Sequence, residues 1–147
     1  MEYRDLYKAK RVDDGEWVTG QYVKGLDMYD KEVHLIFEPT TIFYSSGETD
    51  GWSEIDQSTI CRCIGSTDKN NNLIFENDIM KNKHNSYRVV WDNNEGSWLL
   101  AFDSVPLYGL GGANSKEYEV IGNIFDNPEL LNKREKTYCK DESDLER

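Results

Sequence analysis

The stretch Tyr87–Phe102, with the sequence YRVVWDNNEGSWLLAF, decides the fold class of this chain. Two runs rich in β-branched and aromatic residues, Tyr87–Trp91 and Ser97–Phe102, flank the polar segment Asp92–Gly96. Such side chains favour strands, and a Gly-containing loop of this length joins antiparallel neighbours. The stretch therefore predicts a β-hairpin.

Further short strand patterns lie on both sides of this hairpin. The predicted strands cover residues 16–23, 32–37, 41–44, 58–64, 73–75, 78–80 and 118–125, with a turn at 68–72. Residues 45–52 and 104–116 are predicted loops, and Pro39 is expected to end a strand. Asn127 and Pro128 are the cap and the first position of one short C-terminal helix.

Closely spaced short strands favour a mainly β fold over alternating β and α units. We expect antiparallel strands arranged in small barrel or sandwich lobes, with the one short helix at the C-terminal end. The predicted organisation is an N-terminal β lobe at 1–66, a C-terminal β lobe with the helix at 67–131, and a flexible charged tail at 132–147.

The composition limits the classes of partner. The 147 residues carry 17 Lys and Arg against 28 Asp and Glu, a formal net charge of −11. This surface repels a polyanion, so direct nucleic-acid binding is not expected. No apolar run approaches the ~18 residues of a membrane helix, and the first residues do not resemble a secretion signal. We expect a cytoplasmic protein without membrane contact.

Residues capable of catalysis or metal binding are few. The two histidines, His34 and His84, lie in an apolar strand and a polar loop, without the neighbours of a catalytic pair. Cys61 and Cys63 point to one face of a strand, but zinc needs two more ligands, so small apolar filling is their expected role. We predict no catalytic residue, no metal site and no cofactor.

Aromatic residues give the better functional signal. Trp91 and Trp98 flank the hairpin and are expected to fill a core. Trp17 and Trp52 are less clearly internal, and an exposed aromatic residue on a small β domain can hold a peptide or a protein. Core packing is the favoured interpretation for each of them, and Trp17 and Trp52 are the candidate protein-contact residues if the rings are exposed.

Several segments resemble the YopX family of phage and prophage proteins. The resemblance rests on Asp68-Lys69-Asn70, Ile74–Ile79, Val90-Trp91 with Gly96, Trp17 with Gly20, and above all Tyr118–Leu131, YEVIGNIFDNPELL. Asn stands here at positions where the family has Gly, near Asn71 and at Asn77, as expected for left-handed backbone. The resemblance implies a mainly β fold with an SH3-like C-terminal part and a phage or prophage origin in a bacterial host. It implies no established activity.

These observations favour a non-enzymatic protein-interaction or structural module. Edge strands and exposed aromatic residues make a homo-oligomer plausible, and the identity of any other protein partner stays open. One alternative is an acidic decoy that occupies a basic nucleic-acid-binding protein. A lesser alternative is a small hydrolase-type enzyme.

Overall fold

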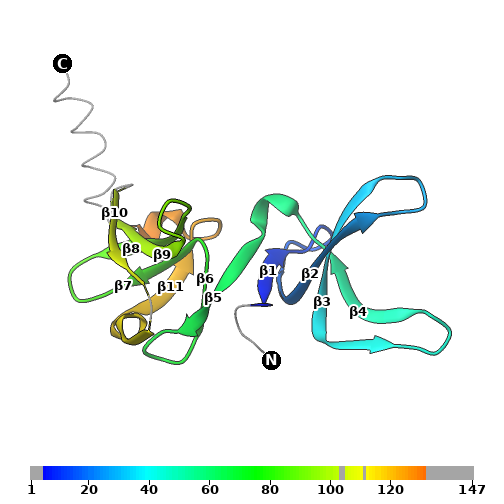
Figure 1. Ribbon diagram of the computed structural model, residues 1–147, viewed down its shortest axis with the longest axis horizontal. Helices are drawn as coiled ribbons and strands as arrows, with labels where there is room; N and C mark the ends of the chain where they lie inside the picture. Colours follow the sequence, from blue (N-terminus) through cyan, green and yellow to red (C-terminus); the bar gives the residue numbers. More distant parts are fainter. Residues whose placement is uncertain (1–4, 103–104, 111, 132–147) are drawn as a thin grey trace, which may run out of the picture. The chain divides into compact units, whose positions relative to one another are not determined.

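The structure is a computed structural model that describes residues 5–102, 105–110 and 112–131. The chain is mainly β and forms antiparallel sheets, as the sequence predicts. The strands are β1 Tyr7–Lys10, β2 Trp17–Leu26, β3 Glu32–Phe43, β4 Thr49–Glu54, β5 Cys61–Thr67, β6 Leu73–Phe75, β7 Asp78–Lys81, β8 Ser86–Asp92, β9 Ser97–Phe102, β10 Val105–Gly109 and β11 Glu119–Asn123. Figure 1 labels them along the chain.

Two sheets contain these strands. One has the order β4-β3-β2-β1-β5-β6 and the other the order β10-β9-β8-β7-β11. Neither sheet closes into a barrel among the described residues, so the small-barrel version of the expected fold is not realised. The expected C-terminal helix is also wrong, because Pro128–Leu130 forms a single 3-10 turn. The side chain of Asn127 makes no capping hydrogen bond at that turn, which leaves nothing to nucleate a longer helix.

The chain divides into two compact units, an N-terminal unit 1–63 and a C-terminal unit 64–147. The boundary between the units falls within β5, after Cys63, whereas the sequence predicts a boundary after Ser66. The tail predicted at 132–147 lies outside the described residues.

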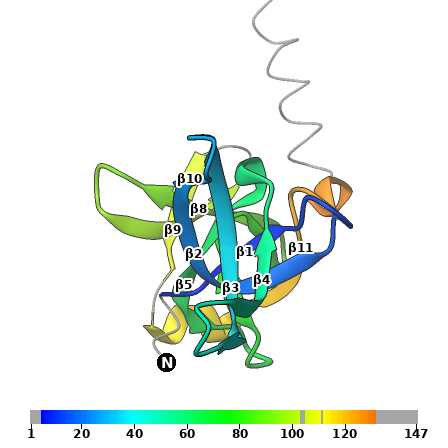
Figure 2. The same cartoon turned by 90° about the vertical axis from the view of Figure 1, so that its right-hand side faces the viewer.

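The N-terminal unit is a twisted sheet in which β2, β3 and β4 lie side by side (Figure 2). Its core contains Ala9, Val18, Ile36 and Ile55, which share one face because paired residues of neighbouring strands point the same way. Gly20 lies on that face, where a Cβ atom would come within 2.1 Å of the Phe37 carbonyl oxygen. Only glycine allows this approach of β2 to β3.

β3 passes through Pro39 instead of ending there, which corrects the sequence prediction. Its register with β4 shifts between Phe37 and Ile42, so four residues of β3 lie opposite Gly51. The Thr41 hydroxyl donates to the carbonyl oxygens of Glu38 and Gly51, at 2.6 and 3.1 Å. This bulge accommodates the proline, whose missing N–H would interrupt a regular ladder.

The predicted hairpin is confirmed as β8 and β9 in the C-terminal unit. Trp91 lies opposite Trp98, with ring centroids 5.0 Å apart in an edge-to-face arrangement. The loop closes at Gly96, whose φ is 64°. The core of this unit contains buried apolar residues, namely Ile74, Met80, Tyr87, Val89, Leu100, Leu110 and Tyr118. Trp98 packs against this core, whereas the indole N–H of Trp91 donates to Asn93 Oδ1 at 2.7 Å.

The segment predicted as the loop 104–116 is more regular than expected. It contains β10, paired with β9, and part of the 3-10 helix Gly112–Glu117. Pro106, Gly109 and Gly112 argue against a strand in isolation, but β10 is an edge strand, where missing donors and irregular register are tolerated.

The predicted turn at 68–72 is confirmed and is organised by a buried carboxylate. Asp68 Oδ1 accepts hydrogen bonds from the main-chain N–H groups of Asn70 and Asn72, at 2.9 and 2.8 Å. Asn71 and Asn77 have φ values of 64° and 70°. These are left-handed conformations, which confirms the expectation of left-handed backbone at these asparagines.

Candidate functional site

Trp52 lies on a strand and not in the loop that the sequence predicted. It belongs to β4, the edge of its sheet, and pairs with Phe37 of β3. Its side chain is 47% exposed, which is high for a tryptophan on a paired strand. The sequence pattern does not predict this strand, because it contains or follows Gly47, Asp50 and Gly51, whose residue types are depleted from strands.

Trp17 is placed differently. It lies on β2, is half-buried, and has the ammonium groups of two β1 lysines over its ring. The Nζ atoms of Lys8 and Lys10 are 4.8 and 5.5 Å from the ring centroid. These are cation–π distances, so residues of the chain itself cover part of the indole. Trp17 is not among the residues that line the pocket beside Trp52, which is described next.

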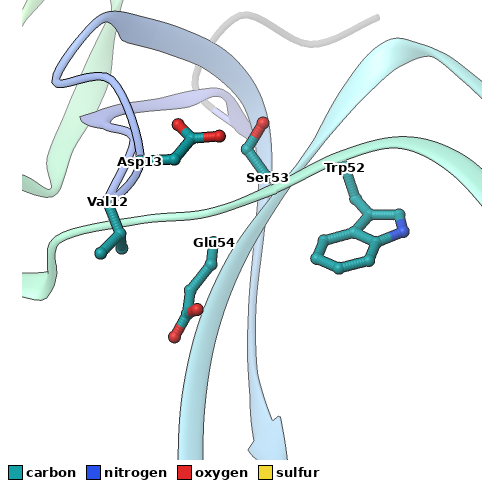
Figure 3. Close-up of a pocket in the computed structure, with 5 residues that line it drawn as sticks. All are labelled: Val12, Asp13, Trp52, Ser53 and Glu54. Atoms are coloured by element: carbon teal, nitrogen blue, oxygen red, sulfur yellow. The ribbon is translucent and has the colours of Figure 1, made fainter.

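A pocket of about 370 Å³ lies beside Trp52 on the N-terminal unit. Figure 3 shows the residues that line it, which are Val12 and Asp13 from the turn after β1, and Trp52, Ser53 and Glu54 from β4. The turn is held against β4 because the Val12 N–H donates to the Glu54 carbonyl oxygen at 3.0 Å. The lining of the pocket therefore includes an indole and two carboxylates. Figure 3 shows Trp52 and Glu54 on one side of β4 and the Asp13 side chain on the other.

These two carboxylates form no ion pair within the described part of the chain. The nearby cation, Arg11, is already engaged: its Nε donates to Ser53 Oγ at 3.0 Å, and its terminal nitrogens lie 3.5 Å from Asp14 and 3.7 Å from Glu38. Asp13 and Glu54 are exposed. The pocket thus carries uncompensated negative charge next to an aromatic ring.

A second exposed feature is the tip of the β2–β3 hairpin, which we define as Leu26–Tyr29. Leu26, Met28 and Tyr29 are 67%, 85% and 82% exposed. Asp27 Oδ1 accepts hydrogen bonds from the N–H groups of Tyr29 and Lys31, at 2.8 and 3.0 Å. Sequence reasoning missed this tip, although apolar residues around a turn-forming Asp between two strands were a usable signal.

A linked set of titratable groups lies on the same hairpin. The hydroxyl of Tyr22 is 2.5 Å from His34 Nδ1, His34 Nε2 is 3.6 Å from Glu32, and Glu32 pairs with Lys24 at 2.8 Å. The hydrogen bond from Lys24 and then its charge lower the pKa of Glu32, and the same contacts raise the pKa of Lys24. His34 is buried and lines neither pocket described here. We therefore interpret this set as packing of the hairpin.

A second pocket and two buried cysteines lie outside the Trp52 pocket. A shallow pocket of about 530 Å³ lies by the β7–β8 loop and is lined by Lys81, Asn82, Lys83, His84, Asn85, Ser86, Glu129, Leu130 and Leu131. Cys61 and Cys63 are both buried, and the Cys61 thiol donates to the Thr59 carbonyl oxygen at 3.3 Å. Residues 5–102, 105–110 and 112–131 contain no group of three or more His, Cys, Asp or Glu arranged to hold a metal ion.

Within the described ranges, no helix is long and apolar enough to cross a membrane. A search of curated proteins found no match to this chain. The family model described as YopX protein matches residues 6–132, a range that covers most of both units and every strand described above. The chain therefore belongs to the YopX protein family.

Proposed function

We propose that this YopX-family chain is a non-enzymatic module that acts through contacts with proteins, its own copies included. The observation that supports the proposal most is the distribution of exposed apolar side chains. The most exposed large hydrophobic residues of the described chain all lie in the N-terminal unit, namely Val12, Val23, Leu26, Met28, Tyr29, Ile42, Tyr44 and Trp52. Exposed apolar side chains concentrated in one unit of a chain favour an interaction role for that unit.

The tip Leu26–Tyr29 is the best-formed of these contact elements. The hydrogen bonds to Asp27 fix the turn, so the side chains of Met28 and Tyr29 are presented on an ordered backbone. Less conformational entropy is then lost when a partner covers them. A rigid, mostly exposed aromatic side chain is also a frequent energetic centre of a protein interface.

The experiment compares the wild-type chain with the double variant Met28→Ser/Tyr29→Ser. Multi-angle light scattering measures self-association, and capture from a bacterial lysate measures partners. We expect the wild type either to exceed the 17.1 kDa of one chain or to retain a protein, and the variant to lose that contact. Glu95→Gln, an exposed change in the β8–β9 loop, is the matched control. A monomer that retains no protein would refute the proposal, and proteins retained equally with and without the tip would refute the assignment of the contact to the tip.

The proposal includes a phage or prophage origin and an SH3-like character for the C-terminal unit, which follow from the family resemblance. It also includes action in the cytoplasm of the bacterial host, which follows from the lack of a predicted membrane helix or secretion signal. A second candidate function is the acidic decoy. It is favoured by the stretch Glu32–Cys61, which holds six carboxylates and neither Lys nor Arg. If the chain is a decoy, it should compete with nucleic acid for a basic protein, and high salt should abolish its binding to that protein.

A further inference from the structure

The open edge of β4 beside Trp52 offers main-chain hydrogen-bonding groups that the sheet does not use. The Ile55 N–H donates to the His34 carbonyl oxygen, so the main-chain groups of Ile55 point towards β3. Because the direction of these groups alternates along a strand, those of Ser53 point towards β3 as well. Glu54 faces the other way, since its carbonyl oxygen accepts from Val12. The same alternation directs the N–H and C=O of Trp52 away from β3. β4 is the last strand of its sheet, but residues 10–12 cover its outer side at Glu54–Asp56, because Arg11 forms a β-bridge with Ile55 and the Asp56 N–H donates to the Lys10 carbonyl oxygen at 2.8 Å. The open part of the edge therefore ends at Trp52.

The side chains along this edge are an aromatic ring and a carboxylate in alternate positions. Trp52 and Glu54 are two residues apart and therefore share a face of the strand. Asp13 adds a second carboxylate from the adjoining turn, and the three residues line one pocket. A cationic side chain is complementary to both kinds of group, since it pairs with carboxylates and stacks on an indole face.

The charge around the edge points to the same class of partner. The stretch from Glu32 to Cys61, which forms β3 and β4, contains Glu32, Glu38, Glu48, Asp50, Glu54 and Asp56 and no Lys or Arg. Lys24 and Arg11 pair with Glu32 and Glu38, but Glu48, Asp50 and Glu54 form no ion pair within the described residues. A negative field at an edge strand attracts positive segments and repels a second copy of the same edge.

From this juxtaposition we propose that β4 binds an extended basic segment of another protein, with Lys or Arg at every second position. The segment adds a strand to the sheet at Trp52. One of its cations then lies against the Trp52 indole and beside Glu54, at the point where residues 10–12 close the edge. This inference rests on the proposed protein-contact function and specifies a partner class and a site for it. The recognition mode is strand addition, in which main-chain bonds hold the segment and alternate side chains select it.

The experiment titrates the full chain into a fluorescent eight-residue peptide that alternates Lys and Thr, and reads anisotropy. The matched control peptide has the same composition, with four Lys followed by four Thr. We expect the alternating peptide to bind at least about tenfold more tightly, because only its lysines reach one face together. The affinity should fall as salt is raised, since exposed charges are screened over about 8 Å at physiological ionic strength. N-methylation of alternate peptide residues should abolish binding, because it removes the donors of the added strand.

Variants of the chain locate the site. Trp52→Ala and the double variant Asp13→Asn/Glu54→Gln should each weaken binding about tenfold, the size of a lost cation–π or charge contact. Trp52→Phe, which keeps an aromatic face, should lose less, and circular dichroism checks that each variant folds. Glu95→Gln should bind as the wild type does.

Three results would overturn the inference: no binding of the alternating peptide, equal binding of the clustered peptide, or binding unchanged by the Trp52 and carboxylate variants. The tip variant Met28→Ser/Tyr29→Ser separates this inference from the proposed function, because it should bind the peptide normally. If the tip variant loses a captured partner while the wild type ignores the peptide, the β4 site fails and the protein-contact function stands.

Discussion

The carboxylate of Asp68 accepts a hydrogen bond from the main-chain N–H of Val120 at 2.9 Å, across 52 positions of the sequence. The same side chain is fully buried and also accepts the N–H groups of Asn70 and Asn72. One carboxylate therefore closes the turn after β5 and attaches it to β11. These two segments also carry much of the resemblance on which the sequence analysis rests, and the Asp68 carboxylate connects them directly.

Replacement of Asp68 by Asn should destabilise the C-terminal unit by about 1–3 kcal/mol. The amide keeps the shape but loses one acceptor oxygen, so a buried N–H group is left without its charged partner. Urea denaturation measures the loss. Asp56→Asn is the control, because Asp56 makes a similar pair of bonds to Ser58 but is exposed. Equal losses for the two variants would contradict the role assigned to Asp68.

The same carboxylate makes stability depend on pH. Burial acts to raise the pKa of Asp68, but the hydrogen bonds from Val120, Asn72 and Asn70 outweigh it and lower the pKa below its ordinary value. The unfolded chain then takes up this proton at a higher pH than the folded chain does. The contribution is complete above the unfolded pKa of about 3.9 and is lost as the pH falls through the folded pKa.

Unfolding free energies measured from about pH 7 down to about pH 2 check this dependence. We expect the wild type to lose stability on acidification more steeply than Asp68→Asn, with the difference between them shrinking below about pH 3.9. A difference that stays constant over the whole range would show that the charge of Asp68 contributes nothing.

Gly20 and Gly25 form a matched pair on β2. A Cβ at Gly20 would overlap the Phe37 backbone, whereas a Cβ at Gly25 meets nothing within 4 Å. We expect Gly20→Ala to cost at least about 1–3 kcal/mol through overpacking, because backbone cannot move aside as a flexible side chain can. Gly25→Ala should leave the melting temperature unchanged or slightly higher. A similar melt for both variants would contradict the close approach of β2 and β3.

The sequence pattern predicts those parts of the fold that depend on residues close to one another in the chain. The β8–β9 hairpin and the 68–72 turn follow from alternation and from turn residues next to one another in sequence, and both are confirmed. β4 was missed because its Gly and Asp content disfavours a strand until β3 pairs with it across the bulge. The predicted strand end at Pro39 was wrong for the same reason, since the bulge that accommodates the proline depends on Thr41 and Gly51 together.

The candidate site, too, could be predicted from the sequence only in part. Composition and residue type singled out Trp52, and the structure gives it an exposed position on an edge strand. No sequence pattern showed that the turn containing Asp13 lies against Glu54, because a hydrogen bond between Val12 and a strand about forty residues later makes that contact. The pocket is therefore a product of tertiary structure, while its aromatic component was visible in the sequence.

Leu100 and Ile121 test where the core of the C-terminal unit lies. The alternation of Tyr118–Phe125 predicts a strand buried between layers, and this is wrong: β11 is an edge strand, and Ile121 is only half-buried. The register shift between Val120 and Gly122 disturbs the alternation, so that Tyr118 and Val120 contact the core and Ile121 does not belong to it. Leu100, on central strand β9, is fully buried within that core.

Leu100→Ala should therefore cost about 2–5 kcal/mol, since a fully buried side chain leaves a cavity that the sheet cannot fill. Ile121→Ala should cost clearly less, because its side chain already contacts solvent in the folded state and its removal leaves an open surface in place of a cavity. Thermal and urea melts of the two variants, each compared with the wild type, measure the difference directly. If Ile121→Ala proves as costly as Leu100→Ala, β11 is covered on both faces, and the assignment of Ile121 to the edge of the unit is wrong.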